Sequence, residues 1–217
     1  MQVKRVDIDG PALGDPQAGV WQNLLSRKVA LTPTPVAMQG SKYILGKWKD
    51  GEFGHLGALG LQALHNGTDI AFRLEWACEP RSDTPLDNDQ FADAAALLFP
   101  LSDTAPIIMG IEGAPVNIWH WRADRPKAAR NNVAEGIGTS RFSKSGPTVA
   151  TQAAHHHGRW FVVFRRALVA TPPSAETADF HPGQTHRVAA AIWNGANAER
   201  AGLKAYSPEW VELDLEA

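Results

Sequence analysis

Hydrophobic and polar residues alternate with a period of two over several short segments of the chain. The clearest segment is Asp69–Cys78, DIAFRLEWAC, whose even-numbered positions are all apolar. Such alternation is typical of a strand with one buried face. Five further segments alternate or form short apolar runs next to Gly or Pro, and they are Arg27–Val36, Val116–Trp121, Arg159–Val169, His186–Trp193 and Glu209–Leu215. The chain therefore predicts a mainly β protein.

Helical signals are weaker than strand signals. Asp89–Phe99 begins with an acidic residue that can cap a helix and is rich in alanine, which favours a short helix. Polar or Pro/Gly-rich connections are expected at Glu79–Asn88, Asp124–Ser145 and Thr171–Gly183, and the second is long enough for a functional loop. These elements predict an antiparallel β-sandwich with long loops and a few short helices. A sandwich of 217 residues fits one domain, residues 1–217.

Composition excludes several classes of protein. The net charge of −2 and the lack of a basic stripe argue against a nucleic-acid partner, and no apolar run reaches the roughly 18–20 residues of a membrane span. Cys78 is the only cysteine, so an internal disulfide, a cysteine-based zinc or iron–sulfur site and a covalently attached haem are excluded. The N-terminus lacks the apolar core of a signal peptide. By itself this indicates the cytoplasm, although a mature exported chain behind a start Met would look the same.

Two alternative functions come from the residues alone. The eight tryptophans could stack on sugar rings, as in a non-catalytic carbohydrate-binding sandwich, or they could fill the core. A metal-dependent enzyme could use His155, His157, His181 and His186, but their spacing matches no known metal site and no candidate base accompanies them. The histidine triplet 155–157 favours a solvated turn.

Two other stretches contain a second kind of candidate ligand. In the first, Met109 lies between an apolar segment and a glycine, just before the aromatic-rich segment Pro115–Arg122. In the second, an apolar run ends at Trp193, and Lys204 follows a short polar loop. Taken singly, a methionine most often fills a gap in a core, and a lysine is most often a solvated surface charge.

Together these stretches resemble the haem b, or gamma, subunit of type II enzymes of the dimethyl sulfoxide reductase family. That group includes the ethylbenzene, dimethyl sulfide, selenate and chlorate enzymes. The resemblance extends over most of the chain, in shared order and spacing, through Trp21–Leu25, Val29–Pro33, Ile70–Trp76, Phe91–Ala95, Phe99–Pro100, Met109–Gly110, Pro115–Trp119, Trp193–Gly195, Glu199–Arg200 and Lys204. The haem of this family has a methionine and a lysine as axial ligands, and the resemblance gives these roles to Met109 and Lys204.

The resemblance implies one non-covalent b-type haem that transfers electrons and does not catalyse, because two protein ligands leave no open position on the iron. Candidate walls of the pocket are Trp119, Trp121 and Trp193, which could equally be plain core residues. Candidate partners of the propionates, chosen because they are near Met109 in the sequence, are Asn117, Arg122 and the Arg125–Arg130 loop. Lys204 can bind iron only as a neutral amine, which costs roughly 4–5 kcal/mol at pH 7 unless burial lowers its pKa.

The same resemblance implies partners and a compartment. Subunits of this kind accompany a molybdopterin catalytic subunit and an iron–sulfur subunit in a heterotrimer. They exchange electrons with a soluble c-type cytochrome. The expected location is the periplasm, with any signal peptide removed from this chain.

Overall fold

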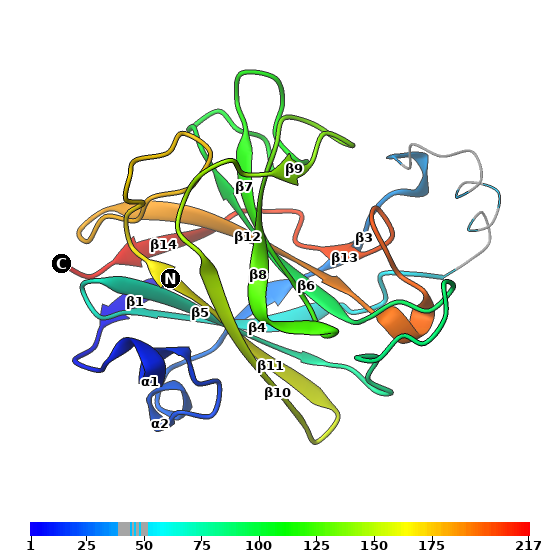
Figure 1. The fold of residues 1–217 in the computed structure, drawn as a ribbon, viewed down its shortest axis with the longest axis horizontal. Coiled ribbons are helices and arrows are strands. Elements are labelled where there is room, and N and C mark those ends of the chain that lie inside the picture. Colours follow the sequence, from blue (N-terminus) through cyan, green and yellow to red (C-terminus); the bar gives the residue numbers. More distant parts are fainter. Residues whose placement is uncertain (39–43, 45, 47, 49–51) are drawn as a thin grey trace.

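The computed structural model describes residues 1–38, 44, 46, 48 and 52–217, and strands dominate it (Figure 1). The helices whose residues the structure describes throughout are short: α1 (Gly10–Gly14), α2 (Gly19–Gln22) and the 3-10 turns η1 (Val36–Met38) and η2 (Gly195–Asn197). The strands are β1 (Gln2–Arg5), β2 (Arg27–Ala30), β3 (Thr32–Pro33), β4 (Ala58–His65), β5 (Asp69–Ala77), β6 (Ala94–Pro100), β7 (Val116–Arg122), β8 (Arg125–Ala134), β9 (Arg141–Phe142), β10 (Val149–His156), β11 (Arg159–Ala167), β12 (Thr185–Trp193), β13 (Ala205–Tyr206) and β14 (Val211–Leu215). The predicted mainly β class with few short helices is confirmed.

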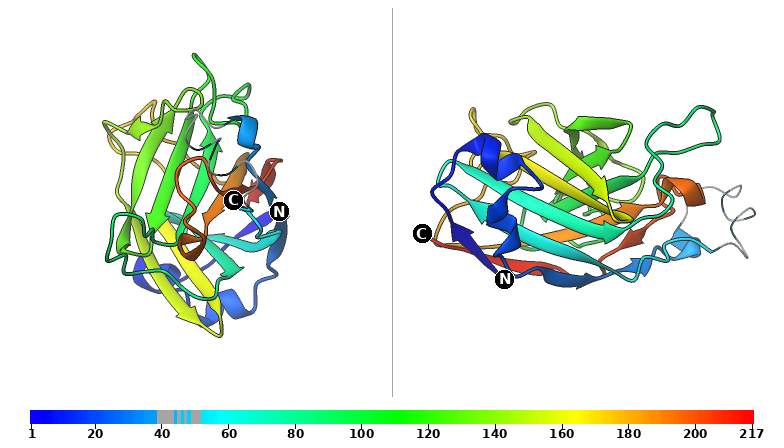
Figure 2. Two further views of the ribbon diagram at one scale, coloured as in Figure 1. Left: turned by 90° about the vertical axis from the view of Figure 1, so that its right-hand side faces the viewer. Right: turned by 90° about the horizontal axis from the view of Figure 1, so that it is seen from below.

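The strands form one continuous sheet that folds back on itself. Hydrogen bonding follows the order β14-β1-β4-β5-β11-β10-β8-β7-β6-β12, and a further pairing of β12 with β14 closes the path. The two layers of the sandwich are therefore joined into a flattened, barrel-like sheet, and Figure 2 shows the layers from two further sides. Neighbouring strands run antiparallel except at β1, which is parallel to both β14 and β4.

The main core lies between the two layers and consists of side chains at alternate positions of facing strands. On β5 these are the even-numbered residues that the sequence pattern indicated. Phe72 packs against Trp119 of β7, with ring centroids 5.7 Å apart, and against Phe180 at the same distance. On the opposite face of the β4–β5–β11 layer, Leu13 of α1 and Trp21 of α2 cover a smaller apolar cluster.

Most of the expected strands are present close to their expected limits, as β5, β7, β11, β12 and β14. The segment Arg27–Val36 divides into β2, which pairs with β4, and β3, which pairs with β13. Its strand structure ends at the prolines, as expected for residues that have no backbone N–H to donate to the hydrogen bonds between strands.

Three expectations from the sequence were wrong. The predicted helix Asp89–Phe99 is mostly β6, a central strand between β7 and β12, because packing on both of its faces overrides the helix propensity of alanine. The expected loop Asp124–Ser145 contains β8 and β9; the first half of β8 is exposed, so it lacks an apolar pattern. The histidine triplet is not a separate turn: His155 and His156 end β10, and the turn occupies His157 and Gly158, both with positive φ.

Candidate functional site

A second apolar cluster lies on the outer face of the β6–β7–β8–β12 layer, on the side away from the main core. Its buried members are Ala94, Ala96, Ala105, Ala114, Val116, Ile118, Ala134 and Trp193. Five of these eight side chains are alanine methyl groups, so the outer face has a floor of small apolar groups with the Trp193 indole at one side. Met109 packs against this cluster while remaining partly exposed.

The backbone of Met109 is held in an unusual conformation. Its φ is 61°, in the left-handed region that side chains other than glycine rarely occupy. Gly110 follows with a φ of 71°, and a Cβ there would lie 2.9 Å from the carbonyl oxygens of Ala114 and Ala134. The Met109 carbonyl accepts a hydrogen bond of 2.8 Å from the Gly136 amide. The turn between β6 and β7 thus fixes Met109 against the sheet, and strain of this kind often marks a functional position.

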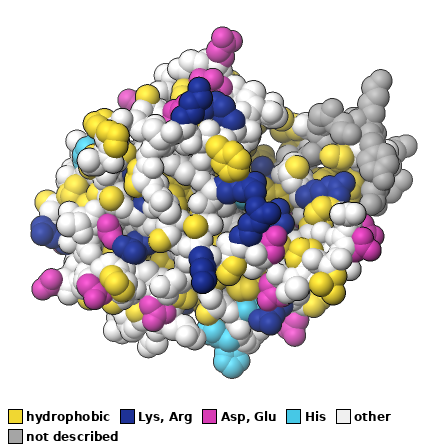
Figure 3. Space-filling model, viewed as in Figure 1, with side chains coloured by type: hydrophobic (Ala, Val, Ile, Leu, Met, Phe, Trp, Pro, Cys, Tyr) yellow, Lys and Arg dark blue, Asp and Glu magenta, His cyan; other side chains and the backbone are white. Residues whose placement is uncertain are grey.

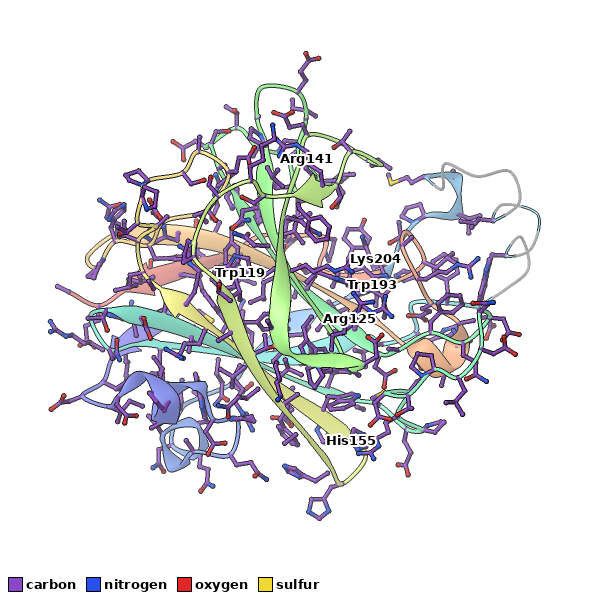
Figure 4. The ribbon with its side chains drawn as sticks, viewed as in Figure 1. Trp119, Arg125, Arg141, His155, Trp193 and Lys204 are labelled. Atoms are coloured by element: carbon purple, nitrogen blue, oxygen red, sulfur yellow. The ribbon has the colours of Figure 1, made fainter. Side chains whose placement is uncertain are left out.

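Lys204 reaches the same cluster from the loop between β12 and β13. Its Nζ lies 5.1 Å from the centre of the Trp193 ring, and Figure 4 shows the two side chains together. Within the described part of the chain, no acceptor is found within hydrogen-bonding distance of Nζ, and no carboxylate pairs with it. Burial lowers the pKa of Lys204 to about 8. An amine with a lowered pKa and no acidic partner is available as a ligand.

A buried carboxylate organises the loop that carries Lys204. Glu199 accepts hydrogen bonds from the backbone amides of Gly54, at 2.7 Å, and Asn194, at 2.9 Å. Its Oε1 also accepts from the side chain of Asn197, at 3.1 Å. A Cβ on Gly54 would approach the Lys204 carbonyl oxygen to 2.8 Å. Glu199 therefore ties two loops together, and the resulting close packing sets the position of the Lys204 backbone.

A second buried carboxylate fixes the start of the same loop. Asp93 is inaccessible to solvent, and its Oδ1 accepts a 2.9 Å hydrogen bond from the Gly195 amide. Its Oδ2 accepts from the indole of Trp160, at 3.0 Å, and from the thiol of Cys78, at 3.3 Å. A Cβ on Gly195 would lie only 2.1 Å from the Phe91 carbonyl oxygen. Only glycine permits this close approach.

His120 of β7 lies beside the candidate ligands. Its ring meets the Trp193 ring edge-on, with centroids 5.1 Å apart. Its pKa is lowered to about 4, mainly by burial and further by the positive charges of Arg122, Arg130 and Lys204. The imidazole is therefore neutral at pH 7. Arg130 places positive charge near it, whereas the charge of Arg122 is paired with that of Asp124. Sequence reasoning did not assign His120 to the site, although the alternation of β7 places it on the same face as Ile118.

Asn117 and Trp119 lie on the other face of β7. Trp119 is fully buried in the main core, where its ring centroid is 4.6 Å from that of Phe99. Its indole donates a 2.9 Å hydrogen bond to Oδ1 of Asn117, which also accepts from the Ala178 amide. Of the five candidate residues, Met109 and Trp193 belong to the outer-face cluster and Lys204 lies over the Trp193 ring. Asn117 and Trp119 lie on the opposite face of β7.

The residues of the two alternative functions are arranged differently. Across the described ranges, no group of three or more His, Cys, Asp or Glu side chains is placed to hold a metal ion. His155 Nε2 lies 2.9 Å from the Cys78 carbonyl oxygen, whereas the rings of His181 and His186 lie 6.3 Å apart. All eight tryptophans are buried or half-buried. The described helices are only a few residues long, and none could span a bilayer.

The closed sheet defines a β-sandwich protein of an architecture also found in carbohydrate-binding proteins. A family 9 carbohydrate-binding module from Caldicellulosiruptor kristjanssonii, solved with glucose, superposes with a TM-score of 0.54 and 8% identity, over 100% of this chain and 95% of that one. A carbohydrate-binding protein from Bacteroides uniformis gives a TM-score of 0.52 and 12% identity, over 100% of this chain and 98% of that one. At these identities the likeness concerns the fold alone.

Sequence comparison identifies the family. The chain belongs to the ethylbenzene dehydrogenase family, whose model matches residues 18–148 and 136–205. It is 30% identical to the chlorate reductase gamma subunit of Ideonella dechloratans, over 97% of this chain and 83% of that protein. This confirms the resemblance noted from the sequence.

Two further relatives match over shorter ranges. The chain is 36% identical to a protein of Haloferax mediterranei named as the heme subunit of a respiratory nitrate reductase, over 71% of this chain and 55% of that protein. It is 32% identical to the dimethylsulfide dehydrogenase gamma subunit of Rhodovulum sulfidophilum, over 64% and 53%. The chain thus spans about half the length of these two proteins. The names of all three relatives denote accessory subunits of redox enzymes, which confirms a non-catalytic electron-transfer subunit at the level of the family.

Proposed function

We propose that this chain binds one haem b without a covalent bond and transfers single electrons as a subunit of a molybdenum oxidoreductase. One observation carries the proposal: Met109 and Lys204 are 95 residues apart in the sequence, yet both pack at the outer-face cluster around Trp193. A thioether and an amine are the two ligand types that the family resemblance requires. In this proposal, Met109 and Lys204 are the axial ligands and Trp193 is a wall of the haem site.

The remaining groups of the site fit a haem. The outer-face cluster, with alanines on β6 and β8 and Val116 and Ile118 on β7 between them, would give apolar contact to a flat macrocycle. Arg130 contributes positive charge at one side, where two propionates would need compensation, while Arg122 is held by Asp124 through two hydrogen bonds of 2.8 Å. Oδ1 of Asn132, opposite Ile118, is buried without a hydrogen-bond partner. The amide of Asn132 can present its oxygen or, after a flip, its NH2 group, and it replaces Asn117 as a candidate polar contact to the haem.

The protonation state of Lys204 supports the ligand assignment. With a pKa of about 8, deprotonation at pH 7 costs about 1.4 kcal/mol, since one pKa unit corresponds to about 1.36 kcal/mol. Burial has therefore already removed most of the cost that an ordinary lysine would carry. The thioether of Met109 is a soft ligand that favours ferrous iron and raises the reduction potential. A haem bound on both sides supplies reversible one-electron chemistry and offers no site for substrate.

The partners and the compartment in this proposal follow from the relatives. The partners are a molybdopterin catalytic subunit and an iron–sulfur subunit, with a soluble c-type cytochrome as the redox partner, and the location is the periplasm. The likeness to carbohydrate-binding modules supports no sugar-binding function, because the tryptophans that would stack on sugar rings are buried or half-buried.

The test is an absorption spectrum of the purified protein, oxidised and dithionite-reduced, with a pyridine haemochrome assay. We expect a b-type spectrum near one haem per chain, low-spin in both states. Met109→Leu and Lys204→Arg should each lose the native low-spin spectrum. Met38→Leu and Lys144→Arg make the same changes at exposed positions and should retain it. A protein that stays colourless after haem titration refutes the proposal, and retention of the native spectrum in Lys204→Arg refutes the ligand assignment.

A further inference from the structure

The loop that carries Lys204, residues 194–204 between β12 and β13, has a strained backbone. Ala198 and Ala201 have φ angles of 53° and 49°, in the left-handed region that alanine rarely adopts. Residues in this region persist only where the surrounding structure holds them. The shape of this loop, and with it the position of Lys204, therefore depends on the contacts that hold the loop.

Glu199 supplies such contacts from the middle of the loop. Its side chain is buried, and both carboxylate oxygens are occupied. Oε2 accepts from the amide of Asn194 at the start of the loop, and Oε1 accepts from the amide of Gly54 and the side chain of Asn197. All three donors are neutral N–H groups. A buried carboxylate is costly unless it is hydrogen-bonded, so these three bonds hold Glu199 and its partners together.

The contacts of Glu199 continue to the backbone of Lys204. A Cβ on Gly54 would lie 2.8 Å from the Lys204 carbonyl oxygen and 2.7 Å from Cα of Pro33, so Gly54 packs closely against both segments. The same carbonyl oxygen accepts hydrogen bonds from the amide of Thr34, at 3.0 Å, and from its hydroxyl, at 3.3 Å. Burial, and not a nearby charge, lowers the pKa of Lys204. Glu199 therefore acts on the position of Lys204 and not on the charge of its amine.

The candidate haem site lies at the surface, where small molecules reach it from solvent. Met109 is only half-buried, and Figure 3 shows hydrophobic side chains beside Lys and Arg side chains over β7 and β8. A ferrous haem with an open axial position binds carbon monoxide or dioxygen, whereas a haem bound on both sides by protein does not. Exclusion of these molecules therefore depends on axial ligands that stay bound.

We propose that Glu199 is a positioning residue that keeps Lys204 on the haem iron and thereby excludes carbon monoxide and dioxygen. This inference rests on the proposed function, because it takes Lys204 as an axial ligand. An amine on a backbone that is already fixed gives up less conformational freedom when it binds iron. Without the hydrogen bonds of Glu199 the strained loop relaxes and carries the amine away, which opens the sixth position of the iron. Glu199 thus confines the haem to electron transfer.

The test is a titration of the dithionite-reduced, haem-loaded full chain with carbon monoxide, followed by absorption spectra. In Glu199→Gln one acceptor oxygen becomes an NH2 group, which cannot accept from a backbone amide, and the affinity for carbon monoxide should rise about tenfold. That rise corresponds to about 1.4 kcal/mol, the order of one buried hydrogen bond. Asn197→Ala removes only one donor to the carboxylate and should give a smaller rise. The control Gln62→Leu also removes a buried polar side chain, whose Nε2 donates to the carbonyls of Trp21 and Leu24, and should leave the affinity unchanged.

A double variant shows whether Glu199 acts through Lys204. Lys204→Ala should bind carbon monoxide most tightly, because the sixth position of its iron is open. Adding Glu199→Gln to Lys204→Ala should raise the affinity no further, since the second change acts only on a ligand that is already gone. The inference is overturned if Glu199→Gln binds carbon monoxide no more tightly than the unmodified chain, or if the double variant binds it clearly more tightly than Lys204→Ala. An unmodified chain that takes up no haem refutes the proposed function instead.

Discussion

Replacing Lys204 by methionine should stabilise the haem-free protein at neutral pH. In the folded chain burial lowers the pKa of Lys204 from 10.5 to about 8, so the unfolded chain holds this proton more tightly. Below pH 8 the lysine therefore costs stability, and the cost disappears as the pH rises from 8 to 10.5. A difference of about 2.5 pKa units corresponds to about 3 kcal/mol at pH 7, falling to about 2 kcal/mol at pH 9. Lys204→Met removes this cost.

Urea unfolding of the haem-free protein, followed by tryptophan fluorescence at pH 7 and pH 9, measures the effect. With a slope of about 2–3 kcal/mol per M, the midpoint of Lys204→Met should exceed that of the wild type by about 1 M at pH 7. Its advantage should shrink by about 1 kcal/mol at pH 9. Lys127→Met, at a position exposed to solvent, should show no pH-dependent difference. An advantage of Lys204→Met that is absent, or identical at both pH values, would refute the reasoning.

Three further substitutions test the site and the core by urea unfolding. Gly195→Ala should lower the free energy of unfolding by about 3 kcal/mol, because the new Cβ would lie 2.1 Å from the Phe91 carbonyl oxygen. The control Gly57→Ala, where a Cβ would have nothing within 4 Å, should change the free energy of unfolding by less than about 0.5 kcal/mol. Equal urea midpoints for the two variants would contradict this prediction. Ala201→Gly should stabilise by about 0.5–1 kcal/mol, since φ is 49° there, and a lower melting temperature would count against it. Trp119→Ala should cost about 3–5 kcal/mol and leave the haem bands unchanged, and the opposite pattern would place this residue at the haem.

The fold could be predicted from the sequence wherever a strand has one buried face. β5 shows the period of two because its even-numbered residues face the main core. β6 was mistaken for a helix because both of its faces are covered and its alanines show no alternation. β8 was missed because exposed residues such as Lys127 occupy its first half. In each case the hydrophobic pattern of the strand depends on which other elements pack against its two faces. The sequence of the strand itself does not identify those elements.

The candidate site was harder to predict than the fold. Neither Met109 nor Lys204 stands out by composition or spacing, and only the family resemblance singled them out. The alternation of β7 already separated Asn117 and Trp119 from Ile118 and thus from the outer face. The hydrophobic pattern could not predict on which face of β7 the loops of Met109 and Lys204 lie. The position of these loops depends on how the sheet closes.

The positions of the two candidate ligands also affect the resistance of the chain to unfolding. Met109 precedes β7 and Lys204 precedes β13, so an iron atom bound to both would act as a cross-link that closes a loop of 95 residues. A covalent cross-link of that span restricts the unfolded chain by about 4–5 kcal/mol in the chain-entropy model. The haem would thus serve as a reversible cross-link in a chain whose single cysteine permits no internal disulfide. The same group would then carry the electron and stabilise the fold. Loss of haem would release the segments that carry Met109 and Lys204 at the same time.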